Sequence, residues 1–315
     1  MAAPRTAAPV RPPGIRHDDH QGLRGDPRDQ PAPQPTASGW HPTDWACEAV
    51  GTAFQLFVGF GAVALLEAPQ SSVRADLPSW LRLVLLGVVF GALAAAVALS
   101  PVGRRSGAHL NPAVTLGFFL RKHTSWRDLL GYAGAQTAGA LVAAAVFRVV
   151  WGSWAAGVHT ARTVPAGDLP GWGVAGIEAA LTFGLLTVVF LMVSSPRTAR
   201  LAPVAVTGAL AGLIWAGAGH TGASMNPSRT FGPDVVAGAF GAFWAYVVGP
   251  LAGAVAAALG FSVLGRERRT LTAKLYHDPA YPSVHATSLP ARPHRGTNQT
   301  AGAGDASPRR PARTG

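Results

Sequence analysis

The stretch Gly107-Ala-His-Leu-Asn-Pro-Ala-Val-Thr-Leu-Gly117 decides the fold, because the chain repeats it as Gly222-Ala-Ser-Met-Asn-Pro-Ser-Arg-Thr-Phe-Gly232. The two stretches align without gaps, and six of their eleven positions are identical. Asparagine is a favoured N-cap, and proline is preset for the first position of a helix. Asn111 and Asn226, each followed by proline, therefore predict two helix starts at matching places in the chain.

Six long apolar runs surround these stretches and predict transmembrane helices. Each run has about the 20 residues that a helix needs to cross about 30 Å of hydrocarbon. The runs cover Trp45–Leu66, Trp80–Ser100, Leu129–Val150, Trp172–Ser194, Leu201–Ala218 and Phe240–Val263. Three runs separate the two Asn-Pro stretches, which therefore enter the membrane from opposite sides. We expect an all-α membrane protein with an inverted repeat and two re-entrant half-helices, since each stretch is too short to span.

Charge divides the chain into three parts. Residues 1–44 and 264–315 hold 14 of the 26 Lys and Arg residues and 8 of the 15 Asp and Glu residues. The whole chain is only 13% charged, against about 25% for a soluble domain. We expect a disordered tail at 1–44, a membrane domain at 45–263 with repeats at about 45–150 and 172–263, and a basic, largely disordered tail at 264–315.

The loops predict how the protein is oriented. The segment between the second and third runs carries five basic residues, and the segment between the fourth and fifth carries Arg197 and Arg200 without an acid. Basic loops stay in the cytoplasm, so we expect both termini there, in a multi-pass protein of the plasma membrane. These loops and the C-terminal tail account for most of the net charge of +11, which argues against nucleic acid as a partner.

The paired helix starts also predict a pore. If the two half-helices meet at the membrane centre, their positive dipole ends point into one short region. The amides of Asn111 and Asn226 can donate there to a passing oxygen, and loop carbonyls can accept. Such a pore passes a single file of water and repels cations, protons included.

At these residues the sequence resembles the aquaporin, or major intrinsic protein, family, in its bacterial type. Ser106-Gly-Ala-His-Leu-Asn-Pro-Ala-Val-Thr115 is similar to the first family box, and the second box has Ser228 where alanine is usual. The resemblance covers about residues 45–263 and implies a passive channel that assembles as a homotetramer. The pore residues that it implies are Asn111, Pro112, Ala113, Asn226, Pro227 and Ser228.

The resemblance also implies roles for four charged or polar residues. Arg229 would lie in the outer constriction, where it donates hydrogen bonds to solute and opposes cations; a purely structural ion pair is the alternative. Glu48 and Glu178 would accept hydrogen bonds from the backbone of the re-entrant loops instead of relaying protons. His109 would brace its loop instead of touching solute.

The remaining positions of the implied selectivity filter are ambiguous by one residue. Ala223 takes the loop position, the second span supplies Phe90 or Gly91, and the fifth span supplies Ile214 or Trp215. The histidine of strict water channels is absent from all of these, which favours a wider or more apolar filter.

Two further positions favour water. Thr230 stands where glycerol-conducting relatives have an aspartate, and Tyr246 resembles the water-selective branch. We therefore expect a water channel, with glycerol or another small neutral solute as the alternative.

Other classes of protein fit the sequence less well. A coupled secondary transporter also uses inverted repeats, but coupling normally needs a titratable group at the midplane, where Asn111 and Asn226 are neutral. We see no nucleophile–base pair, metal-ligand cluster or phosphate-binding loop. We therefore expect no enzyme activity, no cofactor and no metal, and water or a small neutral solute in a lipid bilayer as the partners.

Overall fold

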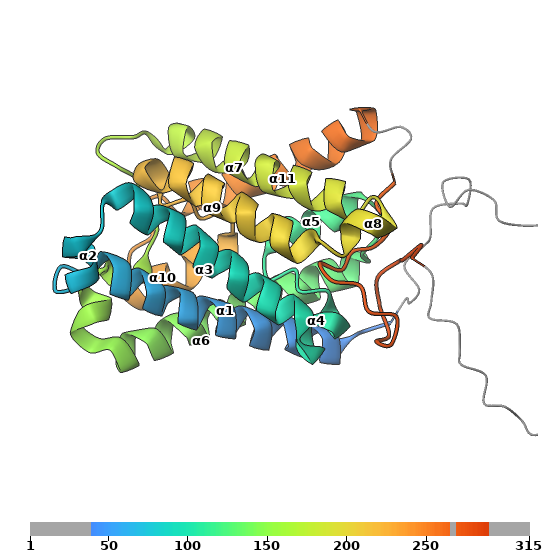
Figure 1. Ribbon diagram of the computed structural model, residues 1–315, viewed down its shortest axis with the longest axis horizontal. Helices are drawn as coiled ribbons and strands as arrows, with labels where there is room; N and C mark the ends of the chain where they lie inside the picture. Colours follow the sequence, from blue (N-terminus) through green and yellow to red (C-terminus); the bar gives the residue numbers. More distant parts are fainter. Residues whose placement is uncertain (1–38, 265–268, 290–315) are drawn as a thin grey trace, which may run out of the picture.

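Six long helices form the body of the molecule in the computed structural model, which describes residues 39–264 and 269–289 (Figure 1). All six are long and apolar enough to cross a membrane. They are α1 (Pro42–Glu67), α3 (Ser79–Leu99), α6 (Trp126–Gly157), α7 (Gly171–Met192), α9 (Ala202–Thr221) and α11 (Phe243–Leu264). Two shorter helices, α5 (Pro112–Leu120) and α10 (Pro227–Ala237), begin directly after the paired asparagines. The predicted fold of six spans and two half-helices is confirmed.

The connections contain further short helices that the sequence reading did not predict. They are α2 (Ser72–Asp76), α4 (Pro101–Ser106), α8 (Pro196–Ala199) and the 3-10 turn η1 (His159–Ala161). Helix α6 runs seven residues past the predicted end at Val150, beyond a break at Gly152, whose φ is 48°. Helix α1 begins before the predicted boundary at residue 45, and Asp44 in its first turn is buried.

Two glycines show that both halves of the repeat pack in the same way. A Cβ atom added at Gly139 of α6 would lie 2.3 Å from the carbonyl oxygen of Ala49 in α1. One added at Gly253 of α11 would lie 2.3 Å from the carbonyl oxygen of Ala179 in α7. Ala49 and Ala179 directly follow Glu48 and Glu178, the matching carboxylates of the two halves. Small residues at these crossings let helix backbones touch, which is how helices associate in lipid.

Residues 269–289, called the strap below, pack across the end of the bundle where α1 begins and α11 ends (Figure 1). The backbone N–H of Leu271 donates to the carbonyl of Val193 at 2.9 Å, and that of Leu275 donates to the carbonyl of Gly107 at 3.0 Å. Leu271, Leu275 and most of the side chains between them are buried.

The prediction of a largely disordered tail over 264–315 is therefore wrong for the strap. Its polar backbone finds partners on loops that are distant in the sequence, and composition alone does not reveal such partners. The predicted disorder at 1–38, 265–268 and 290–315 lies outside the described residues.

The close crossing of α1 and α6 gives a prediction about stability. Gly139→Ala places a methyl group against the Ala49 carbonyl, and such overpacking costs about 1–3 kcal/mol. We expect a lower thermal unfolding temperature for the detergent-solubilised variant. Gly134→Ala on the same helix is the control, because nothing lies within 4 Å of its added Cβ. Equal unfolding temperatures for the two variants would show that the crossing is looser than the structure indicates.

Candidate functional site

Each half-helix is started by its asparagine side chain. The Oδ1 atom of Asn111 accepts from the backbone N–H of Ala113 at 2.8 Å. The Oδ1 atom of Asn226 accepts from the N–H groups of Ser228 at 3.0 Å and Arg229 at 3.3 Å. Proline occupies the first turn of both helices, where its missing N–H costs nothing.

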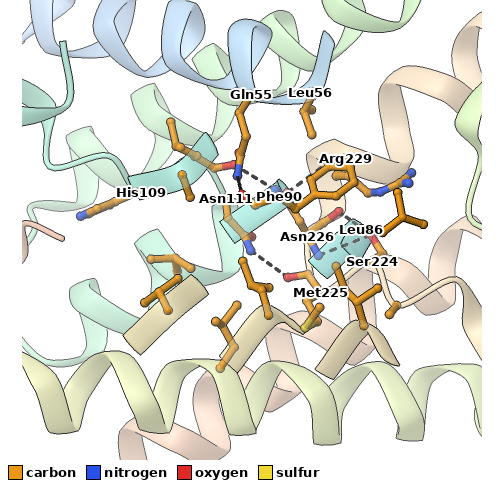
Figure 2. A pocket seen from close by; sticks show the side chains of 18 of the residues that line it. Gln55, Leu56, Leu86, Phe90, His109, Asn111, Ser224, Met225, Asn226 and Arg229 are labelled. Carbon is orange, nitrogen blue, oxygen red and sulfur yellow. Dashed lines mark hydrogen bonds between the residues drawn. The ribbon is translucent and has the colours of Figure 1, made fainter. Parts of the chain in front are cut away.

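The same two asparagines also join the halves to each other. Nδ2 of Asn111 donates to the carbonyl oxygen of Met225 at 2.8 Å, and Nδ2 of Asn226 donates to that of Leu110 at 2.9 Å (Figure 2). Leu110 and Met225 directly precede the two asparagines, so the exchange is reciprocal. An amide nitrogen carries two hydrogens, and each asparagine therefore keeps one donor for a solute.

Two buried carboxylates hold the loops that lead to these caps. Glu48 accepts from the N–H groups of His109 at 3.1 Å and Leu110 at 2.7 Å. Glu178 accepts from those of Ser224 at 3.0 Å and Met225 at 2.6 Å. Each carboxylate thus satisfies two backbone donors that would otherwise be buried without partners.

The loops need this support because their backbone is strained. Ala108 and Leu110 have φ values of 56° and 54°, and Ala223 and Met225 have φ values of 47° and 53°. Left-handed backbone at a residue other than glycine costs about 1–3 kcal/mol. The four strained residues occupy matching positions of the repeat, so both loops follow the same path.

Tyrosines anchor the start of each loop. The hydroxyl of Tyr132 donates to the carbonyl of Ser106 at 2.7 Å, and that of Tyr246 donates to the carbonyl of Thr221 at 2.6 Å. Ser106 and Thr221 each lie five residues before an asparagine of the pair. Tyr246 was singled out above as a cue for water, but it is buried and is not among the residues that line the cavity.

A cavity of about 360 Å³ passes between the two halves and is lined mainly by apolar side chains. Asn111 and Asn226 lie in its middle, with His109 toward one end and Arg229 toward the other (Figure 2). The structure therefore brings both half-helix starts and the arginine to one continuous space.

The cavity lining shows which residue of each ambiguous pair faces the cavity. Phe90, Ile214, Ala223 and Arg229 all line it. Gly91 instead packs against α9, where an added Cβ would lie 2.5 Å from the Cα of Thr207.

Trp215 is 53% exposed on the outside of the bundle. The inclusion of Gly91 and Trp215 among the filter candidates is therefore corrected. Successive residues of a helix point about 100° apart, so only one of each pair can face the cavity.

Arg229 is held by neutral groups. Its Nη1 donates to the carbonyl of Ala161 at 2.7 Å, and its guanidinium lies 5.3 Å from the ring of Phe60. Within the described residues, 39–264 and 269–289, Arg229 takes part in none of the ion pairs. An ion pair between Arg162 and Asp234, at 2.7 Å, ties the loop of Ala161 to α10. This pair helps to hold the Ala161 carbonyl in place for Arg229.

The polar residues at the other end of the cavity contact the strap. His109 Nε2 donates to the carbonyl of Ala273 at 2.7 Å, and Leu275 is among the cavity-lining residues. Leu275 was not predicted to line the cavity, since no motif or pattern around it in the sequence indicates such a role. The sequence reading also missed Gln55, which lines the cavity and donates to the carbonyl of Phe90 at 3.2 Å, although a glutamine inside an apolar run is a signal.

The fold and the site define a membrane protein in which two half-helices from inverted repeats meet in one cavity. A sequence profile described as Major intrinsic protein matches residues 41–261. The chain belongs to the major intrinsic protein family.

Known relatives agree with this assignment. Aquaporin NIP1-4 of Oryza sativa subsp. japonica is 38% identical over 222 residues, which cover 69% of this chain and 75% of that protein. Aquaporin-6 of Rattus norvegicus is 37% identical over 243 residues, which cover 75% of this chain and 82% of that protein. Because these relatives come from a plant and a rodent, the expectation of a bacterial-type member is not borne out.

A solved structure shares the fold. The aquaglyceroporin from Plasmodium falciparum superposes with a TM-score of 0.57 at 22% sequence identity. The match covers 70% of this chain and 94% of that chain. At this identity the likeness concerns the fold alone.

The carboxylate braces give a prediction that does not depend on flux. Glu48→Ala leaves the buried N–H groups of His109 and Leu110 without an acceptor, at a cost of about 1–3 kcal/mol per group. We expect this variant to unfold at a clearly lower temperature than the wild type in detergent. Glu67→Ala, at the far end of α1, removes only a partly exposed pair with Arg82 and should change stability little. Similar losses for both variants would contradict the brace.

Proposed function

We propose that this protein is a passive channel that conducts water in single file and excludes ions and protons. The observation that carries the proposal is the meeting of two half-helix N-termini inside one continuous cavity. The positive ends of both helices oppose cations at that point. Each asparagine offers one N–H to a water oxygen, and these two fixed donors orient the water that passes between them.

Coupled transport is less well supported by the same geometry. A coupled transporter normally places a titratable group or an ion site at the midplane. The two residues that meet in the middle of this cavity are neutral asparagines. Glu48 and Glu178 are fully buried and already accept backbone hydrogen bonds, so neither is placed to carry a proton.

Glycerol or a similar small polyol is a second candidate solute, and one observation favours it. Ile214 lines the same cavity as Arg229, and together with Phe90 and Ala223 it gives the lining an apolar part. A carbon chain can lie against this apolar part while its hydroxyls bond to Arg229.

Proteoliposomes separate these solutes. We expect faster shrinkage than in empty vesicles when a sucrose gradient is imposed, measured by stopped-flow light scattering. Ile214→His replaces an apolar side chain of the cavity lining with a longer, polar one, and should lower glycerol permeability more than water permeability. Trp215→Phe lies outside the cavity and should leave both unchanged. Wild-type vesicles with no more water flux than empty ones would refute the channel.

We further infer that both termini face the cytoplasm of the plasma membrane and that four subunits assemble, each with its own pore. The basic loops after α3 and α7 support the orientation. Membership of the family supports the assembly.

Thiol labelling tests the orientation. In a Cys47→Ser background, Gly167→Cys places a thiol in an exposed loop between η1 and α7, and Lys122→Cys places one in the exposed loop after α5. A membrane-impermeant maleimide added to intact cells should label position 167 and spare position 122. The reverse pattern would invert the proposed topology.

A further inference from the structure

The strap covers the end of the cavity that we assign to the cytoplasm. Leu275 lines the cavity together with residues of the first re-entrant loop, and it is only 8% exposed. Its backbone N–H bonds to Gly107, two residues before His109, and the neighbouring carbonyl of Ala273 accepts from His109. The strap is therefore attached directly to the loop that carries Asn111.

Two histidines hold the two ends of the strap on the bundle. His285 lies in the strap, and its Nε2 donates to the carbonyl of Ser106 at 2.8 Å while its Nδ1 contacts the Thr124 hydroxyl at 3.2 Å. His123 lies in the loop after α5. Its Nδ1 donates to the carbonyl of Ala286 at 2.8 Å, and its Nε2 contacts the Thr270 hydroxyl at 2.6 Å.

The contacts of both rings suit neutral imidazole. In each ring one nitrogen donates to a carbonyl, which cannot donate in return, and the other nitrogen can accept from a threonine hydroxyl. Both rings are buried, at 1% exposure for His285 and 4% for His123. A second proton on either ring would place an unneutralised charge at the interface between the strap and the bundle.

The groups around the two rings do not offset such a charge. Titratable or cationic neighbours face them from the re-entrant loop, α6, the strap and the loop after α5; they are His109, Tyr132, Lys274 and Arg121. His109 stacks on His285 with ring centroids 4.9 Å apart. The carboxylates of this region already have partners: Asp44 contacts Arg105, Asp278 contacts Arg104, Asp128 contacts His41, and Glu48 holds the loop.

We propose that the strap is a lid that closes this end of the cavity by seating Leu275 in it, and that protonation of His123 and His285 releases the lid. Acidification of the cytoplasm, the compartment to which we assign this end of the cavity, then opens the channel. The opening of the channel in this proposal rests on the proposed channel function, although the movement of the lid can be measured without flux.

The sign of the pH effect follows from burial. Burial, with the nearby His109 and Lys274, lowers the pKa of His285 well below its usual value, and burial lowers the pKa of His123. The docked strap therefore binds fewer protons than the free strap. The contribution of the two histidines to docking is fully present above about pH 6.5, and is lost as the pH falls from there toward the lowered pKa values. Each histidine can shift the equilibrium by up to about tenfold per pH unit below about 6.5.

Burial also lowers the pKa of the Lys274 ammonium, to about 8. Its Nζ donates to the carbonyls of Arg104 and Pro282. Lysine and histidine therefore titrate in separate pH ranges, and a change between pH 7.5 and 5.5 belongs to histidines. Burial lowers the pKa of His277 in the strap as well, so the substitutions of His123 and His285 are what assign the change to these two rings.

Thiol reactivity reports the position of the lid in detergent-solubilised protein. In a Cys47→Ser background, Leu275→Cys is buried in the docked strap, and Ala280→Cys is exposed in the same strap. The rate at 275 divided by the rate at 280 cancels the ordinary effect of pH on thiols. We expect this ratio to be low at pH 7.5 and to rise at least severalfold by pH 5.5. Adding His285→Gln, which cannot be protonated, should reduce the rise, and adding His123→Gln as well should flatten it.

Water flux in proteoliposomes shows whether release of the lid opens the cavity to water. Leu275→Ala should raise water permeability at pH 7.5, and the wild type should approach that value at pH 5.5. Val284→Ala, a strap residue outside the cavity lining, is the control and should behave as the wild type.

The outcomes separate the lid from the channel. A labelling ratio that is high at pH 7.5, or flat down to pH 5.5, overturns the lid. A ratio that rises while flux stays constant shows that the strap moves without gating, which also overturns it. Absence of flux in every variant, with a rising ratio, refutes the channel function and leaves only the pH-dependent docking.

Discussion

Two helix N-termini are held end to end in the middle of the helix bundle, and the rest of the structure depends on that contact. Such ends carry unpaired N–H groups and partial positive charge, so they repel each other and need acceptors. The reciprocal bonds from Asn111 to Met225 and from Asn226 to Leu110 supply attraction across the junction. Each asparagine therefore caps its own helix with its oxygen and joins the opposite loop with its nitrogen.

That arrangement forces the loops into backbone conformations that they would not adopt alone. The four left-handed residues before the asparagines are tolerated because Glu48 and Glu178 accept the N–H groups next to them. Buried carboxylates are costly, and here each is offset by several hydrogen bonds. The acids thus serve the geometry of the site without reaching the solute, which is consistent with a channel whose lining is neutral apart from Arg229 and groups near its two ends.

The strap gives the two ends of the cavity different chemistry. At one end, Arg229 is fixed by α10, which carries it, and by its bond to the loop of Ala161. At the other end, closure depends on a segment without regular secondary structure that is held by hydrogen bonds to loops. In the channel that we propose, selectivity and gating can therefore change independently, because they rest on different parts of the chain.

The sequence by itself determined the six spans, the two half-helices and the identity of the central asparagines. The length of an apolar run and the capping of a helix are local properties that a sequence shows directly. The repeat showed in addition that the two capped helices occupy matching places in the two halves of the fold. Only the tertiary structure decided that Phe90 and Ile214, and not Gly91 and Trp215, are on the cavity side. Successive residues of a helix point about 100° apart, and packing against other helices sets which of them faces the cavity. It also decided that the strap docks, since the partners of Leu275 and His285 lie far away in the chain at Gly107 and Ser106. Contacts of that kind leave no periodic pattern in a single sequence.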